Sequence, residues 1–298
     1  MRILISGSTG MLGSPLVQRL RAEGHTVTRL VRSPAQASGD SVVWSPDEGD
    51  LDAVSIEGHD AVIHLAGANI AGARWTAAVK TCILDSRIKG TGLLARAMAE
   101  LTRPPNVFIC ASATGFYGDR GDEVLTEDSP PGDGFLAEVC RAWEAECQPA
   151  AAAGCRVVQT RTGVVLDRHG GALAKLLLPF KLGLGGRLGT GRQYMSWISL
   201  EDQISAFVHV LTHEDIHGPV NFVAPTPVTN AEFTQVLGKV LSRPTIIPVP
   251  SFALRLAAGE MADALLLAST RAVPQQLMDS GFSFRHRTIG EALAEILS

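Results

Sequence analysis

Short apolar runs alternate with longer amphipathic segments over the first 160 residues. The apolar runs are five or six residues long and predict strands at 2–6, 26–31, 61–65, 107–111 and 156–160. The segments between them predict helices at 12–23, 76–100 and 138–153. Continuous apolar runs are typical of strands covered on both faces, and strand–helix alternation is typical of parallel sheets. The pattern therefore predicts an α/β fold with a doubly wound parallel sheet.

The pattern changes after Arg161. Residues 163–192 are rich in glycine and leucine, and we expect a mobile loop at 183–191. Capping residues then predict helices at 199–211 and 231–241, and the tail from residue 252 is expected to be mainly helical. We expect a first domain at 1–165 and a smaller, mainly helical C-terminal lobe at 166–298. The segment at about 195–224 is expected to return to the first domain.

Composition excludes several classes of protein. The 298 residues are 46% hydrophobic and 19% charged, which fits a globular protein, and the net charge of −4 does not fit a nucleic-acid binder. No apolar run approaches the roughly 20 residues of a membrane span. The five cysteines form no CxxC pair, so we expect neither disulfides nor a metal site. The default expectation is a cytoplasmic protein without nucleic-acid or membrane partners.

A glycine motif follows the first strand directly and opens the first helix. Gly7 allows a tight turn, Gly10 allows a pyrophosphate to approach the backbone, and Gly13 allows close packing of the helix on the strand. Phosphates would rest on N–H groups at the helix N-terminus. We therefore predict that residues 1–165 bind a dinucleotide through the motif Gly7, Ser8, Thr9, Gly10, Met11, Leu12 and Gly13.

The end of the second strand selects between the two nicotinamide cofactors. A carboxylate there would bind the ribose 2′-hydroxyl of NAD, but the chain has Arg32 and Ser33, and the nearest following acid is Asp40. A guanidinium suits a 2′-phosphate. The sequence therefore favours NADP(H) as cofactor. The alternative is that Arg32 is a solvated surface charge.

The order of these motifs resembles the extended short-chain dehydrogenase/reductases, in particular the atypical branch called epimerase family proteins. The resemblance covers nearly the whole chain and rests on the motifs at 7–13, 64–67, 86–87, 110–118, 161–166, 177–186, 221–224 and 229–233. Residues 248–296 resemble the small domain of unknown function of that branch. The resemblance implies that Arg32 holds the 2′-phosphate. It also implies further cofactor contacts, by His64 and Leu65 along the adenosine, by Ala66, and by Arg87 and Arg161 in the cofactor cleft.

The catalytic pair of the larger family is missing. Typical members use Tyr-x-x-x-Lys, in which the lysine lowers the pKa of the tyrosine. The chain has two tyrosines, Tyr117 and Tyr194, and neither has a lysine four residues later. The expected helix at 135–144 carries apolar residues or a thiol instead. Ser112 is a candidate to bind a substrate carbonyl, or is an ordinary strand-end hydroxyl. Tyr117 is a candidate proton donor in a loop over the cleft, or a packing residue.

Two further patterns carry chemistry. The segment 213–217 matches HExxH, but Gly218 and Pro219 follow at once, so we do not expect a zinc site. The stretch 168–200 has five cations and no acid, a local charge of +5. It would suit an anionic small-molecule substrate; the alternatives are neutralisation by other segments, a cofactor-phosphate contact or a homodimer contact.

The sequence therefore predicts an NADP(H)-dependent oxidoreductase acting on an unidentified small molecule. A different class remains open, an NADP(H)-binding sensor without catalysis, which the missing pair favours. A sugar-nucleotide epimerase is a third interpretation, and it would need a proton shuttle.

Overall fold

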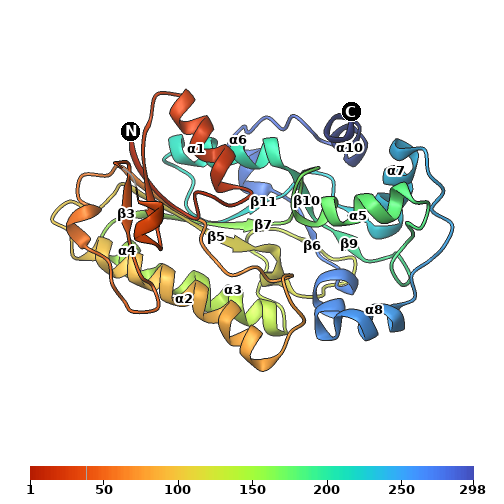
Figure 1. The fold of residues 1–298 in the computed structure, drawn as a ribbon. Helices are drawn as coiled ribbons and strands as arrows, with labels where there is room; N and C mark the ends of the chain where they lie inside the picture. Colours follow the sequence, from red (N-terminus) through yellow and green to blue (C-terminus); the bar gives the residue numbers. More distant parts are fainter. Residues whose placement is uncertain (38) are drawn as a thin grey trace.

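A seven-stranded sheet forms the centre of the molecule, in which every neighbouring pair of strands is parallel (Figure 1). The computed structural model describes residues 1–37 and 39–298. The strand order is β11-β7-β5-β4-β1-β2-β3, so the direction of winding reverses between β1 and β4. The strands are β1 (Arg2–Ser6), β2 (Thr26–Val31), β3 (Ser41–Val43), β4 (Ala61–His64), β5 (Val107–Ala113), β7 (Arg156–Thr162) and β11 (Gly218–Phe222).

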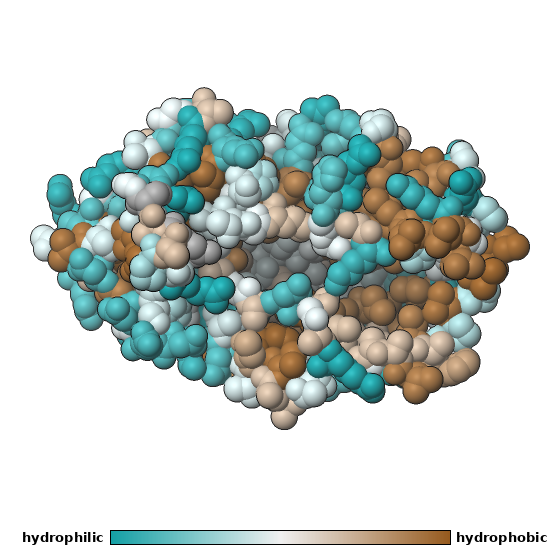
Figure 2. Space-filling view, in the orientation of Figure 1, coloured by the Kyte–Doolittle hydropathy of each residue, from teal (hydrophilic) through white to brown (hydrophobic). Residues whose placement is uncertain are grey.

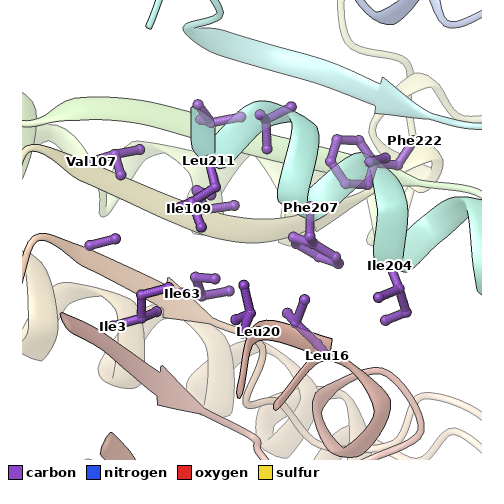
Figure 3. Close-up of a cluster of buried hydrophobic side chains, with 14 of the residues drawn as sticks. Ile3, Leu16, Leu20, Ile63, Val107, Ile109, Ile204, Phe207, Leu211 and Phe222 are labelled. Carbon is purple, nitrogen blue, oxygen red and sulfur yellow. The ribbon is translucent and has the colours of Figure 1, made fainter. Parts of the chain in front are cut away.

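Helices cover both faces of this sheet, which confirms the predicted doubly wound fold. In Figure 1, α1 and α6 lie above the sheet and α2, α3 and α4 below it. Apolar side chains of α1 and α6 pack on alternate residues of the strands, and Figure 3 shows Leu16, Leu20 and Phe207 meeting Ile63 and Ile109. The helices are α1 (Gly13–Ala22), α2 (Ala77–Ala99), α3 (Phe135–Ala145), α4 (Gln148–Ala152) and α6 (Leu200–Thr212).

The opposite face of the sheet has its own core. Leu4, Val62 and Phe108 point towards α2, where they meet Leu94 and Met98. Successive strand residues point to opposite faces, which explains why the apolar runs of the sequence are continuous rather than alternating. All five cysteines are free thiols, and Cys110, Cys140, Cys147 and Cys155 are buried.

The C-terminal lobe is built around a separate apolar cluster. Trp197, Phe233 and Leu293 are buried in it together with residues of α5, including Phe180. Short strand pairs join the lobe to the rest. The remaining elements are η1 (Pro34–Gln36), η2 (Ala53–Ser55), η3 (Thr114–Tyr117), β6 (Val124–Leu125), β8 (Val164–Leu166), α5 (Gly171–Lys181), β9 (Tyr194–Met195), β10 (Trp197–Ser199), β12 (Val228–Thr229), α7 (Asn230–Leu241), α8 (Ser251–Ala258), η4 (Ala262–Leu267), β13 (Arg271–Ala272), α9 (Gln275–Asp279) and α10 (Ile289–Leu297).

One local prediction was wrong. The helix predicted at 138–153 is two helices, α3 and α4, because Pro149 stands near the start of α4 and cannot continue α3. Residues 163–182, for which no element was predicted, contain the strand β8 and the helix α5. The loop predicted at 183–191 contains no helix or strand. Within it the Gly189 N–H donates to the Val249 carbonyl at 2.8 Å and the Leu188 N–H to Asn230 Oδ1 at 2.7 Å. Its mobility stays a prediction.

The contacts between the lobe and the sheet domain include two made by lysines. Lys175 Nζ of α5 donates to the Ala71 carbonyl at 3.1 Å, and Lys80 of α2 pairs with Glu260 at 2.8 Å. Near the middle of the face in Figure 2 the surface is hollowed, over the region where Figure 1 shows the ends of β5 and β7. Within the described residues, no helix has the length and apolar character needed to cross a bilayer.

Candidate functional site

The glycine motif forms a tight turn pressed against the end of β4. Gly7 has φ of 69°, and a Cβ there would lie 2.8 Å from the carbonyl carbon of Leu65. A Cβ on Gly13 would lie 2.2 Å from the Gly7 oxygen. Both glycines are therefore required by backbone contacts, in the conformation that a dinucleotide turn needs. Gly10 closes the turn by donating its N–H to the Gly7 carbonyl at 3.0 Å.

The N-terminus of α1 is open to an anion. Its N-cap residue Leu12 makes no side-chain capping bond, and no acid stands in the first turn. Thr9 and Gly10 are exposed next to it, whereas Ser8 is buried. Uncapped N–H groups and the helix dipole both favour a negative group at this position. The turn and the helix therefore fit a pyrophosphate, with Met11 at their edge.

Arg32 lies exposed immediately after β2. The register pairs Ser6 with Leu30, which places Arg32 beside the start of the glycine turn. The acid that follows it, Asp40, is taken up by Arg29 at 3.0 Å and by Arg21. Ser33 accepts the Ala35 N–H at 3.2 Å and caps η1. No interaction of the Arg32 side chain occurs among the described residues, so its guanidinium is free to bind a phosphate.

His64 does not line an adenosine site, contrary to the implication of the resemblance. Its side chain is fully buried on the α2 side of the sheet, and burial lowers its pKa to about 3. Ser6 Oγ accepts the Leu65 and Ala66 N–H groups, so its own proton points to His64 Nδ1 at 2.6 Å. His64 thus ties β4 to β1. The other two neighbouring residues predicted to contact the cofactor, Leu65 and Ala66, lie against the glycine turn with their backbone atoms.

Arg87 also has a structural position. Its guanidinium donates to the carbonyls of Ile83 at 2.9 Å and Ala68 at 3.2 Å, and lies 4.9 Å from the Trp143 ring. Burial lowers its pKa. Arg87 therefore fastens the loop after β4 to α2 and α3. The cofactor contact that the resemblance implies for Arg87 stays a prediction.

Arg161 is held by Glu144 rather than pointing freely into the cleft. Arg161 Nε lies 3.0 Å from Glu144 Oε1 and Nη2 lies 2.9 Å from Oε2, so the pair is bidentate. The guanidinium also lies 3.5 Å over the Phe116 ring. Burial alone would lower the pKa of Arg161, but the hydrogen bonds and charge of Glu144 outweigh it, so the pKa is raised.

Ser112 lies in the same network. Its hydroxyl, at the end of β5, donates to Glu144 Oε1 at 2.6 Å. Glu144 therefore receives hydrogen bonds from both Ser112 and Arg161, and the short O–H···O⁻ bond is charge-assisted. Ser112 itself is buried, with 4% of its surface exposed. The sequence singled out Ser112 but not Glu144; the available signal was a carboxylate on the sheet-facing side of α3.

Tyr117 does not lie in a loop over the cleft. Its ring is fully buried at the end of η3, and its hydroxyl donates to Asn221 Oδ1 at 2.7 Å and accepts from Arg161 at 3.1 Å. Burial raises its pKa. Glu127 lies beside this group; it accepts the Asn221 N–H, and burial raises its pKa too. This arrangement supports packing rather than proton donation by Tyr117.

The resemblance predicts the position of the family's catalytic pair on α3, and one face of this helix is turned towards β5 and η3. Leu136, Cys140 and Glu144 follow each other at four-residue spacing. Leu136 packs against Gly115, Cys140 Sγ lies 3.7 Å from the Ala113 carbonyl, and Glu144 meets Ser112. Burial raises the pKa of Cys140 to about 12, so this thiol is neutral. Glu144 is the one charged group on this face.

The HExxH segment follows the end of α6. His213 stacks on His209 with ring centroids 3.7 Å apart, and His217 binds the Asp215 carbonyl, so the two motif histidines do not share a helical face. No cluster of three metal-ligating residues occurs among residues 1–37 and 39–298.

A separate recess of about 410 Å³ lies between α1, α6 and α10. His286 lines it, 3.0 Å from Ser199 and 3.1 Å from Glu295. Ser199 is buried and caps α6 by accepting the Asp202 N–H at 3.1 Å. The hydrogen bonds of His286 and Ser199 therefore join the C-terminal segment to α6. The Ser199 hydroxyl is engaged in them and is not a free nucleophile.

Comparison with known proteins agrees with this geometry. The sequence model of the NAD dependent epimerase/dehydratase family matches residues 3–223, and a domain of unknown function, DUF1731, matches residues 249–296. An epimerase family protein of Mycobacterium leprae is 46% identical, covering 98% of this chain and 94% of the relative. A chloroplastic homologue of epimerase family protein SDR39U1 from Arabidopsis thaliana is 38% identical, covering 100% and 87%.

A solved structure is similar to this chain over nearly its whole length. Human epimerase family protein SDR39U1, crystallised with NADPH, superposes with a TM-score of 0.91 at 36% identity, covering 99% of each chain. The match extends over both the sheet domain and the C-terminal lobe. The chain therefore belongs to the NAD dependent epimerase/dehydratase family, within its group of epimerase family proteins.

Proposed function

We propose that this protein binds NADP(H) at the glycine turn, the N-terminus of α1 and Arg32. The observation that carries the proposal is the combination of an uncapped helix N-terminus with an exposed arginine and an acid turned away to Arg21 and Arg29. The relative crystallised with NADPH supports it. A 2′-phosphate at Arg32 would meet an unpaired guanidinium, whereas a bare 2′-hydroxyl would find no carboxylate partner.

We further propose that the protein is an oxidoreductase acting on a small molecule. When bound, NADP(H) would exchange a hydride with the substrate. The chain itself supplies Ser112, whose oxygen accepts a hydrogen bond from a substrate hydroxyl. The substrate proton would pass to Ser112 Oγ while the Ser112 proton passes to Glu144 Oε1 along their 2.6 Å hydrogen bond. Arg161 keeps Glu144 in place as the proton acceptor.

A second candidate is an NADP(H)-binding protein without turnover. It is favoured by the α3 face, where Leu136 and the neutral thiol of Cys140 occupy the positions of the usual catalytic pair. A missing general acid lowers rates by about 10²–10⁴-fold, which leaves slow chemistry measurable. Sugar-nucleotide epimerisation is a third candidate: a nucleoside-diphosphate sugar epimerase of Corynebacterium glutamicum is 38% identical over the whole of this chain, but the buried, bonded Tyr117 does not offer the proton shuttle that this reaction needs. Cytoplasmic location, an anionic substrate and a homodimer stay predictions.

Cofactor binding is tested by calorimetric titration with NADPH and NADH. The wild type is expected to bind NADPH more tightly, and Arg32→Ala to lose at least about tenfold affinity for NADPH, given roughly 1.5–3 kcal/mol per charged hydrogen bond. Its NADH affinity should not change. Arg103→Ala, an exposed arginine elsewhere, is the matched control. Absence of nucleotide binding in the wild type would refute both candidates.

Turnover is tested by following NADP⁺ reduction over a panel of small alcohols. A substrate found in this way should lose about 10²–10⁴-fold in kcat with Ser112→Ala. Affinity for NADPH should be retained, which separates loss of chemistry from loss of the fold. If NADPH binds but no substrate of the panel, nor any carbonyl in the reverse direction, is turned over, the non-catalytic candidate is favoured.

A further inference from the structure

The C-terminal lobe exposes a cluster of large apolar side chains. Among the described residues thirteen large hydrophobic side chains are exposed, and seven come from two segments, at 178–184 and 246–256. Figure 2 shows apolar residues gathered over α5 and α8 on the right of that face. We call this set the apolar patch: Leu178, Leu182, Leu184, Ile246, Ile247, Phe252 and Leu256.

These side chains project outward rather than line a pocket. Their exposed fractions range from 53% to 85%. On α8, Phe252 and Leu256 are four residues apart and both exposed, so the helix turns an apolar stripe to the outside. Leu178 and Leu182 repeat this spacing at the end of α5. A helix packed only on its own domain would direct such a stripe inward, and exposed apolar surfaces of this kind mark interaction sites.

Backbone contacts join the two segments into one surface. Arg243 Nε donates to the Lys181 carbonyl at 2.8 Å, at the end of α5. The Val249 N–H donates to the Arg187 carbonyl at 2.8 Å. Gly186 packs so closely on Ile247 that a Cβ would clash with its carbonyl. The patch is therefore a fixed surface.

The segments that carry the patch also carry cations without acidic partners. The segments 168–200 and 233–259 contain no acid. Of the acids that flank these segments, Glu201 is bonded to Arg285, and Glu260 and Asp263 are bonded to Lys80 and Arg255. Glu232 caps α7 by accepting from Thr229. The cations of the two segments with no ion pair among the described residues include Lys181, Arg187, Arg192, Lys239 and Arg243.

We propose that the apolar patch is a docking surface for an anionic lipid membrane. Exposed Leu, Ile and Phe side chains would enter the interface while the lysines and arginines contact acidic headgroups. Such contact needs no spanning helix. A second copy of the chain fits less well, because a twofold contact would bring Lys181 and Arg243 against their own copies with no acid to pair them.

Co-sedimentation with vesicles tests the proposal. The full chain is expected to bind vesicles of phosphatidylcholine with 30% phosphatidylglycerol at low salt, and pure phosphatidylcholine vesicles much more weakly. Phe252→Ser with Leu256→Ser should lower binding at least about tenfold, since each large side chain loses its apolar burial. Arg243→Glu changes the charge by two and should also lower binding about tenfold or more, at roughly fivefold per charge.

Two control variants separate this surface from general effects. Val54→Ser removes an equally exposed apolar side chain from the sheet domain, and Arg141→Glu reverses an exposed charge on α3; both should bind vesicles as the wild type does. Unchanged thermal unfolding shows that each variant is folded. Equal loss in the controls, or no binding to anionic vesicles, would overturn the proposal. So would a dimer in sedimentation velocity that Phe252→Ser abolishes, which would assign the patch to a second copy.

Discussion

Arg161 of β7 and Glu144 of α3 form a buried bidentate ion pair directly behind Ser112. Their side chains are 5% and 12% exposed. The pair joins the sheet to α3, the helix on which the resemblance predicts the catalytic residues of the larger family. It also holds the carboxylate in hydrogen-bond contact with the one strand-end hydroxyl expected to meet substrate.

Glu144→Gln is expected to destabilise the fold by about 3–5 kcal/mol, because Arg161 is left as an uncompensated buried charge. Chemical denaturation measures this. The double variant Glu144→Gln, Arg161→Met removes both charges and should recover part of the loss. A single variant as stable as the wild type would show that the pair is solvated, contrary to its burial.

Tyr117→Phe is expected to lower stability by about 1–3 kcal/mol, because Asn221 Oδ1 loses its donor inside the protein. Urea unfolding measures the loss. On any substrate found, kcat should be retained, because the hydroxyl lies buried among protein partners. Loss of kcat with unchanged stability would instead identify Tyr117 as the proton donor.

Two glycine substitutions should act in opposite directions. Gly13→Ala places a Cβ 2.2 Å from the Gly7 carbonyl and should cost at least about 1–3 kcal/mol together with nucleotide affinity. Gly290→Ala in α10 meets open space at an ordinary φ and should stabilise the protein by up to about 1 kcal/mol. Thermal unfolding of the two variants compares them directly, and a stable Gly13→Ala protein would contradict the tight turn.

Acid should destabilise the protein in part through His64. Its pKa falls from 6.5 in the unfolded chain to about 3 in the folded protein, so the unfolded state binds the proton between these values. The stabilisation is complete above pH 6.5 and is lost as pH falls towards 3, by up to about 5 kcal/mol. Unfolding free energies at pH 7 and pH 4.5 for wild type and His64→Gln measure the difference. Equal pH dependence in both proteins would show that His64 does not contribute.

The sheet and its order along the chain were predictable from sequence because the signal is local. Continuous apolar runs such as 107–111 mark strands covered on both faces, and Gly7, Gly10 and Gly13 mark a turn whose geometry only glycine permits. Arg32 could be placed at the end of its strand for the same reason. The phosphate-binding role proposed for Arg32 follows from its position directly after the strand. The end of a strand can be predicted from a few neighbouring residues.

The roles of Arg161, Arg87, His64 and Tyr117 could not be predicted, because each depends on the residue that packing brings beside it. Arg161 was expected in an open cleft, but Glu144, 17 residues earlier on a helix, meets it in the core. Tyr117 meets Asn221, which lies 104 residues later. A side chain's type gives its chemistry, whereas its partner, exposure and protonation depend on tertiary contacts. The sequence alone therefore determined the dinucleotide fold and its glycine turn, and only the tertiary structure decided which polar groups face a ligand and which are held inside.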